Sequence, residues 1–158
     1  MGNIFAGSEI VEIGIQIEKN GRDFYNTVSK NSKSTKAKDI YKYLATEEEK
    51  HIAAFKNILD SVEKYEPAEA YPGEYFAYMN ALASEYVFTQ KEKGEEIAKK
   101  IKSDKEAVEK GIAFEKDSIV FYEGMKRVVP DFDRKIVDEL IVQEQSHLAQ
   151  LTELNKIL

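Results

Sequence analysis

The chain has 158 residues, the length of one domain with a substantial hydrophobic core. Its net charge of −6 argues against nucleic acid or an anionic membrane surface as a main partner, because both bind basic faces. The absence of cysteine excludes disulfides, thiolate metal sites, iron–sulfur clusters and cysteine nucleophiles. No stretch reaches the roughly 18 apolar residues of a membrane span, and the N-terminus lacks a secretory pattern, so we expect a cytoplasmic protein.

The first part of the sequence predicts a helical hairpin over about residues 8–65. Ser8 is a plausible N-cap, and apolar residues then recur at helical spacing. A polar turn at residues 31–35 precedes a second helix over about 36–64, which Pro67 ends.

The next part, about residues 66–103, predicts a long and partly helical crossover. An aromatic-rich helical piece runs from Tyr75 to about Gln90 and continues weakly to Ile101. A connection of this length can cross a whole helical bundle. Its side chains are too apolar for a free loop, so it could cover the bundle, exchange between subunits or form a dimer contact, and we favour the dimer contact.

The last part predicts a second helical hairpin over about residues 104–158. Ser103 and Glu106 form a capping box that opens its first helix, which runs to about Val129. Pro130 closes that helix and suits the first turn of the final one.

These elements together predict a single all-α domain over residues 1–158. The aliphatic residues repeat every three to four positions rather than every two, so no strand is indicated. Two αα-hairpins with short turns are joined by the long crossover, which predicts a four-helix bundle.

The two hairpins resemble each other in sequence. The first helices match with an offset of 97 residues (18 to 115), and the second helices match with an offset of 96 (48 to 144). Three residue pairs carry chemistry: Glu18 with Glu115, Glu48 with Glu144, and His51 with His147. The near-constant offset suggests a duplicated hairpin packed about a pseudo-twofold axis.

Each predicted helix has one stripe of small and apolar residues, at every third or fourth position, that should face the core. The stripes run over Val11–Tyr25, Ala37–Val62, Val108–Val129 and Val137–Leu158. One Glu interrupts each stripe near its middle, with a His three residues later on the second and fourth helices. Gly14, Gly21 and Gly111 lie on the stripes despite their low helix propensity, so we expect close helix approach or room for a bridging ligand.

Four buried carboxylates need compensation. Left unpaired, each would cost several kcal/mol, in a domain with about 5–15 kcal/mol of net stability. No Lys or Arg lies on the stripes, whereas two divalent cations would neutralise the four charges, and imidazole with carboxylate suits iron, manganese or zinc. The sequence predicts a dinuclear metal site with six ligands: Glu18, Glu48, His51, Glu115, Glu144 and His147.

Residues beside these six have plainer interpretations. Glu47 and Glu49 point off the stripe, so we expect them to be solvated. Tyr25 and Tyr122 each follow a predicted ligand by seven residues on the same helix face. Core packing is the favoured interpretation of both tyrosines, with a hydrogen bond to the site or a redox role as the alternative.

With these residues in order, the chain resembles the rubrerythrin branch of the ferritin-like di-iron carboxylate superfamily over nearly its whole length. The resemblance implies a ferritin-like bundle with two iron ions, although manganese or zinc accept the same ligands. It also implies roles for the six residues: Glu18 and Glu115 as terminal ligands, Glu48 and Glu144 as bridges, and His51 and His147 as one ligand to each metal. Members of this family reduce hydrogen peroxide and, more slowly, dioxygen.

The sequence departs from that family in two respects. Rubrerythrins carry a rubredoxin domain with four cysteines, and this sequence has none, so the resemblance implies a separate electron donor such as a rubredoxin. Rubrerythrins also have an extra Glu, three residues after the ligand on the third bundle helix, that takes part in a redox-linked ligand switch. Ser118 stands there, and Asp117 lies about 100° round the helix. We therefore expect a more symmetric site, and turnover as a peroxidase stays open.

Three functions are compatible with the sequence. The favoured one is a di-iron oxidoreductase that reduces hydrogen peroxide or dioxygen. The second is a protein that binds, oxidises or stores iron without multiple turnover. The third is a structural bundle whose Glu and His residues share protons. Storage would need a hollow shell, whereas we expect a homodimer, with no nucleic-acid or membrane partner.

Overall fold

The computed structural model describes residues 7–65, 73–85 and 87–158. Within them the chain is all-α, without a strand, as predicted. The helices are α1 (Gly7–Asn31), α2 (Thr35–Tyr65), α3 (Gly73–Glu85), the short 3₁₀ helix η1 (Val87–Thr89), α4 (Lys93–Lys99), α5 (Asp104–Met125) and α6 (Asp131–Lys156). None of the helices in these ranges has both the length and the apolar character needed to span a bilayer.

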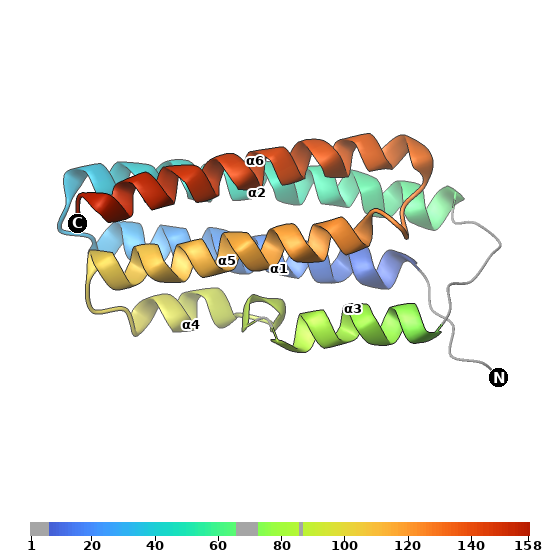
Figure 1. The fold of residues 1–158 in the computed structure, drawn as a ribbon, viewed down its shortest axis with the longest axis horizontal. Coiled ribbons are helices and arrows are strands. Elements are labelled where there is room, and N and C mark those ends of the chain that lie inside the picture. The colour runs from blue at the N-terminus through green and yellow to red at the C-terminus, as the bar shows by residue number, and fades with distance from the viewer. Residues whose placement is uncertain (1–6, 66–72, 86) are drawn as a thin grey trace.

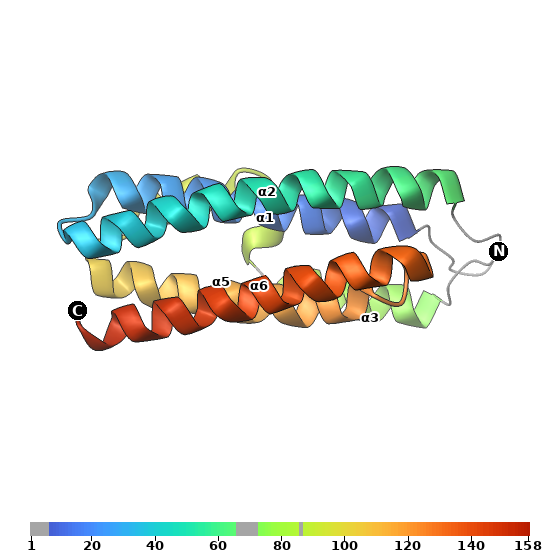
Figure 2. The same ribbon diagram turned by 90° about the horizontal axis from the view of Figure 1, so that it is seen from above.

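Four long helices form the bundle as two hairpins side by side, α1 with α2 and α5 with α6 (Figure 2). Across the bundle α1 packs on α5 and α2 on α6. Because α2 ends at the opposite end of the bundle from the start of α5, the crossover must travel its whole length. Its helices α3 and α4 do so along the α1/α5 side (Figure 1). The α2/α6 side carries no such layer in the described residues.

The core follows the predicted stripes. Every stripe residue is buried except Leu158, which is 37% exposed. α6 ends at Lys156, so the last residues are not held on the helix face. The polar residues of the stripes are buried with their apolar neighbours, which places the four Glu residues inside the bundle.

The predicted capping box at the start of α5 is largely confirmed. The Oγ atom of Ser103 accepts a hydrogen bond from the backbone N–H of Glu106 at 3.1 Å. The Glu106 carboxylate in turn accepts from the backbone N–H of Lys102 at 3.3 Å, one residue before the expected donor. Both contacts satisfy backbone N–H groups that a helix start leaves without partners.

Three other predicted helix ends are wrong by a few residues. α1 already includes Gly7, so Ser8 lies inside its first turn rather than at its cap. α5 ends at Met125 instead of near Val129. Pro130 precedes α6 as its N-cap residue, with an extended ψ of 152°, instead of lying in the first helical turn. Periodicity persists beyond a helix end because the following turn still buries apolar residues.

The crossover covers its own bundle, which is one of its three predicted roles. Met79 and Phe88 are buried, and the Phe88 ring centroid lies 5.6 Å from that of Phe24 and 4.7 Å from that of Phe114. Its helix is interrupted after Glu85, unlike the predicted continuous piece to Gln90. Pro67 lies outside the described residues, and the dimer contact stays a prediction.

Asn20, fully buried on α1, fixes the turn between η1 and α4. Its Nδ2 donates to the backbone oxygens of Phe88, at 2.6 Å, and Gln90, while its Oδ1 accepts from the N–H of Gly94 at 3.2 Å. The backbone of Gly94 lies directly against that of Asn20, so that a Cβ atom would collide with the Asn20 carbonyl oxygen. The crossover is therefore held on α1 two residues away from Glu18.

The substitution Gly94→Ala is expected to lower the free energy of unfolding by about 1–3 kcal/mol, because the clash is with backbone that cannot rotate aside. Urea unfolding followed by circular dichroism measures this change. Gly124→Ala is the matched control, since the tight contacts of its Cβ would be with the flexible end of Met79, which can move aside. Equal stability of the Gly94→Ala variant and the wild type would contradict this packing.

Candidate metal centre

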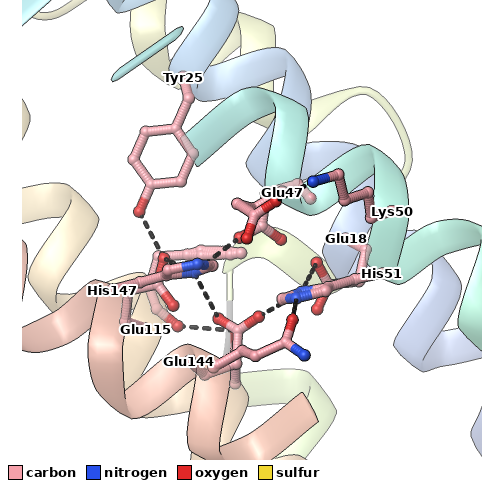
Figure 3. Close-up of polar contacts among 12 residues, drawn as sticks. Glu18, Tyr25, Glu47, Lys50, His51, Glu115, Glu144 and His147 are labelled. Carbon is pink, nitrogen blue, oxygen red and sulfur yellow. Dashed lines mark hydrogen bonds and ion pairs between the residues drawn. The ribbon is translucent and has the colours of Figure 1, made fainter. Parts of the chain in front are cut away.

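All six predicted ligands meet inside the bundle. Glu18 comes from α1, Glu48 and His51 from α2, Glu115 from α5, and Glu144 and His147 from α6. Each is at most 1% exposed. The close-up in Figure 3 shows the side chains from the two hairpins pointing toward one another.

The six side chains form two overlapping groups. One ligand atom from each of Glu18, Glu48, His51 and Glu144 lies within 4.8 Å of the others, and the same holds for Glu48, Glu115, Glu144 and His147. Glu48 and Glu144 belong to both groups. The geometry thus offers two adjacent ion positions that share two carboxylates, which is compatible with a dinuclear site.

Both histidines present Nδ1 to the carboxylates. His51 Nδ1 lies 2.6 Å from Glu144 Oε1 and 3.4 Å from Glu18 Oε2. His147 Nδ1 is more distant: it lies 3.8 Å from a carboxylate oxygen of Glu48 and 3.8 Å from one of Glu115. The two rings are nearly parallel, with centroids 5.6 Å apart and planes inclined by 16°. Each group therefore holds one imidazole nitrogen beside three carboxylates.

Two buried tyrosines connect the hairpins at the site. The hydroxyl of Tyr25 on α1 donates to Glu115 Oε1 on α5 at 2.8 Å. The hydroxyl of Tyr122 on α5 donates to Glu18 Oε1 on α1. Both rings are fully buried, so the favoured core-packing interpretation holds, and the alternative of a hydrogen bond to the site holds as well. The partner glutamate lies on the opposite hairpin in both cases.

Glycines allow close packing beside the site. A Cβ on Gly14 would collide with the Met125 methyl group at 2.6 Å, and one on Gly111 would lie 3.1 Å from Leu151 and 3.3 Å from the Tyr25 hydroxyl oxygen. The expected close approach at these glycines is thus observed. The space beside them is filled by Met125, Leu151 and Tyr25, so it offers no room for a bridging ligand.

Most side-chain oxygen and Nδ1 atoms of the six predicted ligands have no hydrogen-bond partner. Among the described residues, the buried side-chain atoms without a hydrogen bond include both carboxylate oxygens of Glu48 and Glu144, Oε2 of Glu18 and Glu115, and Nδ1 of His51 and His147. Such atoms are rare in folded proteins, because each lost hydrogen bond costs free energy. Their distribution fits cations: two free oxygens on each shared carboxylate and one on each outer carboxylate.

The 2.6 Å approach of His51 Nδ1 to Glu144 depends on protonation. His51 Nε2 lies 2.7 Å from Gln143 Oε1, which can only accept, so Nε2 holds a proton. A neutral His51 then directs an Nδ1 lone pair at a carboxylate oxygen. A second proton on Nδ1, or a cation, removes that repulsion.

The pKa values of the site describe its state without cations. Burial would lower the pKa of His51, but the charges of Glu18 and Glu144 outweigh it and raise the pKa to about 11. Burial and the neighbouring Glu144 raise the pKa of Glu115, and burial and Glu18 raise that of Glu144. Burial and His51 lower the pKa of His147 to about 4. Without cations, the site retains protons where cations would otherwise bind.

The position of the additional family glutamate is closed. Ser118 is buried, and its Oγ donates to the backbone oxygen of Phe114, one turn earlier on α5, at 2.8 Å. Its repeat mate Gly21 lies directly beneath the Phe114 ring. Neither Ser118 nor Asp117 contributes to the two ligand groups found among the described residues.

Two polar neighbours of the site differ from the sequence-based expectation. The prediction that Glu47 is solvated is wrong: its side chain is 14% exposed, and Tyr43 and Lys50 contact its carboxylate. Gln143, which the stripes did not single out, contacts His51. Glu47 and Gln143 are repeat mates, one position before Glu48 and Glu144, so the repeat could have identified them together.

Metal-free protein, prepared with a chelator, is expected to lose stability between about pH 7 and pH 9. The folded state retains the His51 proton up to a pKa of about 11, whereas the ordinary value of 6.5 applies in the unfolded chain. The folded state therefore binds more protons in this range, and the raised pKa values of Glu115 and Glu144 act in the same direction. Urea unfolding should show a loss of about 1 kcal/mol per pH unit.

Two variants serve as controls for this pH dependence. His51→Gln should make the slope shallower, because it removes the retained proton. His147→Gln should leave the slope unchanged, since a His147 pKa of about 4 keeps that ring neutral in this range. Wild-type stability that is constant or rises with pH would contradict the assignment.

Comparison with known proteins agrees with this geometry. The model of the Rubrerythrin family matches residues 9–155. The fold is similar to a crystal structure from Thermotoga maritima, provisionally described as a ferritin-like diiron-carboxylate protein, with a TM-score of 0.73 and 26% identity over 99% of this chain and 98% of that one. A search of curated proteins gives no match. The chain belongs to the rubrerythrin family.

Proposed function

We propose that the chain binds two iron ions and reduces hydrogen peroxide or dioxygen with electrons from a separate donor protein, such as a rubredoxin. The observation that carries the proposal is the distribution of buried ligand atoms without partners. Glu48 and Glu144 would bridge the two ions. Glu18 and His51 would complete one position, and Glu115 and His147 the other.

The charge of the site supports two divalent ions. Four carboxylates balance two divalent cations, and no Lys or Arg forms an ion pair with these four in the described residues. Carboxylate and imidazole together suit iron or manganese. Family membership favours iron.

Two ferrous ions would supply the two electrons that, with two protons, convert one hydrogen peroxide into two waters. The chain's own residues would fix the ligand geometry. Tyr25 and Tyr122 hold one oxygen of each outer carboxylate, leaving the other oxygen for an ion. Gln143 holds the proton of His51 on Nε2, which leaves Nδ1 to coordinate.

The second candidate is iron binding without turnover, as in oxidation or storage. The observation that favours it is Ser118, whose hydroxyl is satisfied by the backbone of its own helix. A site with six ligands lacks the seventh ligand, a fifth carboxylate, that the family resemblance associates with a redox-linked ligand switch. Repeated turnover, rather than a single oxidation, distinguishes the two functions.

The test is to mix anaerobic protein loaded with ferrous iron with hydrogen peroxide. Stopped-flow absorbance is expected to show rapid oxidation, with one peroxide consumed for two ferrous ions. With a reducing rubredoxin present, peroxide consumption should continue over many cycles; a single cycle would support storage instead. Oxidation no faster than that of free ferrous ion would refute the oxidoreductase.

The double variant Glu48→Ala/Glu144→Ala is the control for this test. It removes both shared carboxylates and is expected to bind no metal while its circular dichroism remains helical. Two metal ions per chain in this variant, measured by mass spectrometry, would refute the ligand assignment.

The tyrosine contacts predict selective losses of metal affinity. Tyr25→Phe frees a Glu115 oxygen and should weaken the ion position of His147 roughly 10-fold to 100-fold, whereas Tyr122→Phe should weaken the position of His51. Competition with a chelator measures both affinities. Tyr41→Phe is the control, because that buried hydroxyl donates at 3.2 Å to the Asp104 backbone, outside the site. Unchanged affinities in both tyrosine variants would contradict the positioning role.

A further inference from the structure

Tyr43 on α2 connects the candidate metal centre with the protein surface. The residue is 45% exposed. Its ring nevertheless packs edge to face against the buried imidazole of His147, with ring centroids 6.1 Å apart and planes inclined by 85°. Two aromatic rings in contact can exchange an electron without forming a bond. An ion held by His147 would therefore be one imidazole away from a side chain that solvent reaches.

The hydroxyl of Tyr43 has a proton acceptor of its own. It donates a hydrogen bond to Glu47 Oε1 at 3.2 Å, and Lys50 Nζ lies 2.9 Å from the other oxygen of that carboxylate. A phenol that loses one electron becomes strongly acidic, so its proton leaves along the hydrogen bond. Glu47 is not one of the six predicted ligands, and a proton on it leaves the ligand atoms free.

The two buried tyrosines of the site are less suited to this oxidation. Tyr25 and Tyr122 donate their hydroxyl protons to Glu115 and Glu18. Oxidation of either would place a proton on a carboxylate that is proposed to hold an ion, and protons compete with cations for such groups. Both rings are fully buried, so no external reductant could contact them. Tyr43 has neither restriction.

We propose that Tyr43 supplies one electron to the centre when the position of His147 and Glu115 holds the only ferrous ion. The inference rests on the proposed iron site, where two ferrous ions would supply both electrons for one hydrogen peroxide. With one ferrous ion, that ion gives the first electron and becomes ferric, and Tyr43 gives the second. The O–O bond breaks, two protons enter from solvent, and two waters form.

The other product is a neutral phenoxyl radical on Tyr43, whose proton has passed to Glu47. Because the ring is exposed, a small external reductant such as ascorbate can return the electron, and Glu47 can return the proton. Without a reductant, radicals on two chains can couple through a carbon–carbon bond to form dityrosine. The radical and dityrosine are both observable independently of peroxide consumption.

The test confines one ferrous ion to one position. His51→Gln leaves the ligands of the His147 position complete, and the anaerobic protein with one ferrous ion per chain is mixed with one equivalent of hydrogen peroxide. Electron paramagnetic resonance of rapidly frozen samples is expected to show a tyrosyl radical, which is lost when Tyr43→Phe is added. His147→Gln, which confines the ion to the other position, should give no such signal.

Tyr78→Phe is the matched control, because Tyr78 is 50% exposed on α3 and its ring packs on Tyr75 rather than on a ligand. The radical should persist in this variant, and mass spectrometry of peptides should find dityrosine at Tyr43 rather than at Tyr78. Equal dityrosine at both positions would indicate a freely diffusing oxidant and overturn the inference. A radical that survives Tyr43→Phe, or that is equally strong in His147→Gln, would also overturn it.

The same two tyrosine variants in the wild-type background, with one ferrous ion per chain, give the same comparison if a histidine variant does not fold. Wild-type protein with two ferrous ions separates this inference from the proposed function. If peroxide does not oxidise that protein rapidly, the proposed function is refuted. If it does, and Tyr43 forms no radical in the one-ion samples, only the present inference fails.

Discussion

The structure depends on one electrostatic constraint: four carboxylates lie in the middle of a bundle where their ion-pair partners are two histidines. A core of this kind is stable only if protons or cations compensate the charge. Protons do so in the metal-free chain, as the raised pKa values of Glu115 and Glu144 indicate. Stability and ion binding therefore involve the same atoms, and any change in one alters the other.

Two tyrosine hydrogen bonds, one in each direction, link the two hairpins at the site. Tyr25 supports the outer carboxylate of the second hairpin, and Tyr122 supports that of the first. Gly14 and Gly111, which lie near the two rings, are repeat mates too. The position of each outer carboxylate thus depends on how the hairpins dock, so the ligand geometry is a property of the whole bundle rather than of either helix pair.

Much of this site could be predicted from sequence, because helical periodicity identifies the buried face of each helix. Glu18, Glu48 and their repeat mates were found in this way. Periodicity does not say which helix a face contacts, so it could not predict the hydrogen-bond partners of Tyr25 and Tyr122. It also failed for Glu47, which lies off the stripe but is covered by Tyr43 and Lys50. It does not predict the turn between η1 and α4 either, where Glu92 has a φ of 61° and Gly94 is hydrogen-bonded to Asn20.

The division of ligands between the hairpins has an evolutionary consequence. In the proposed site each hairpin would supply three ligands to one ion position and lend its shared carboxylate, Glu48 or Glu144, to the other. A single ancestral hairpin that associated with an identical copy would already form the complete centre. Two identical copies could not carry an acid directly before one shared carboxylate and an amide directly before the other. A single chain is free of that restriction, and the repeat mates Glu47 and Gln143 differ in this way.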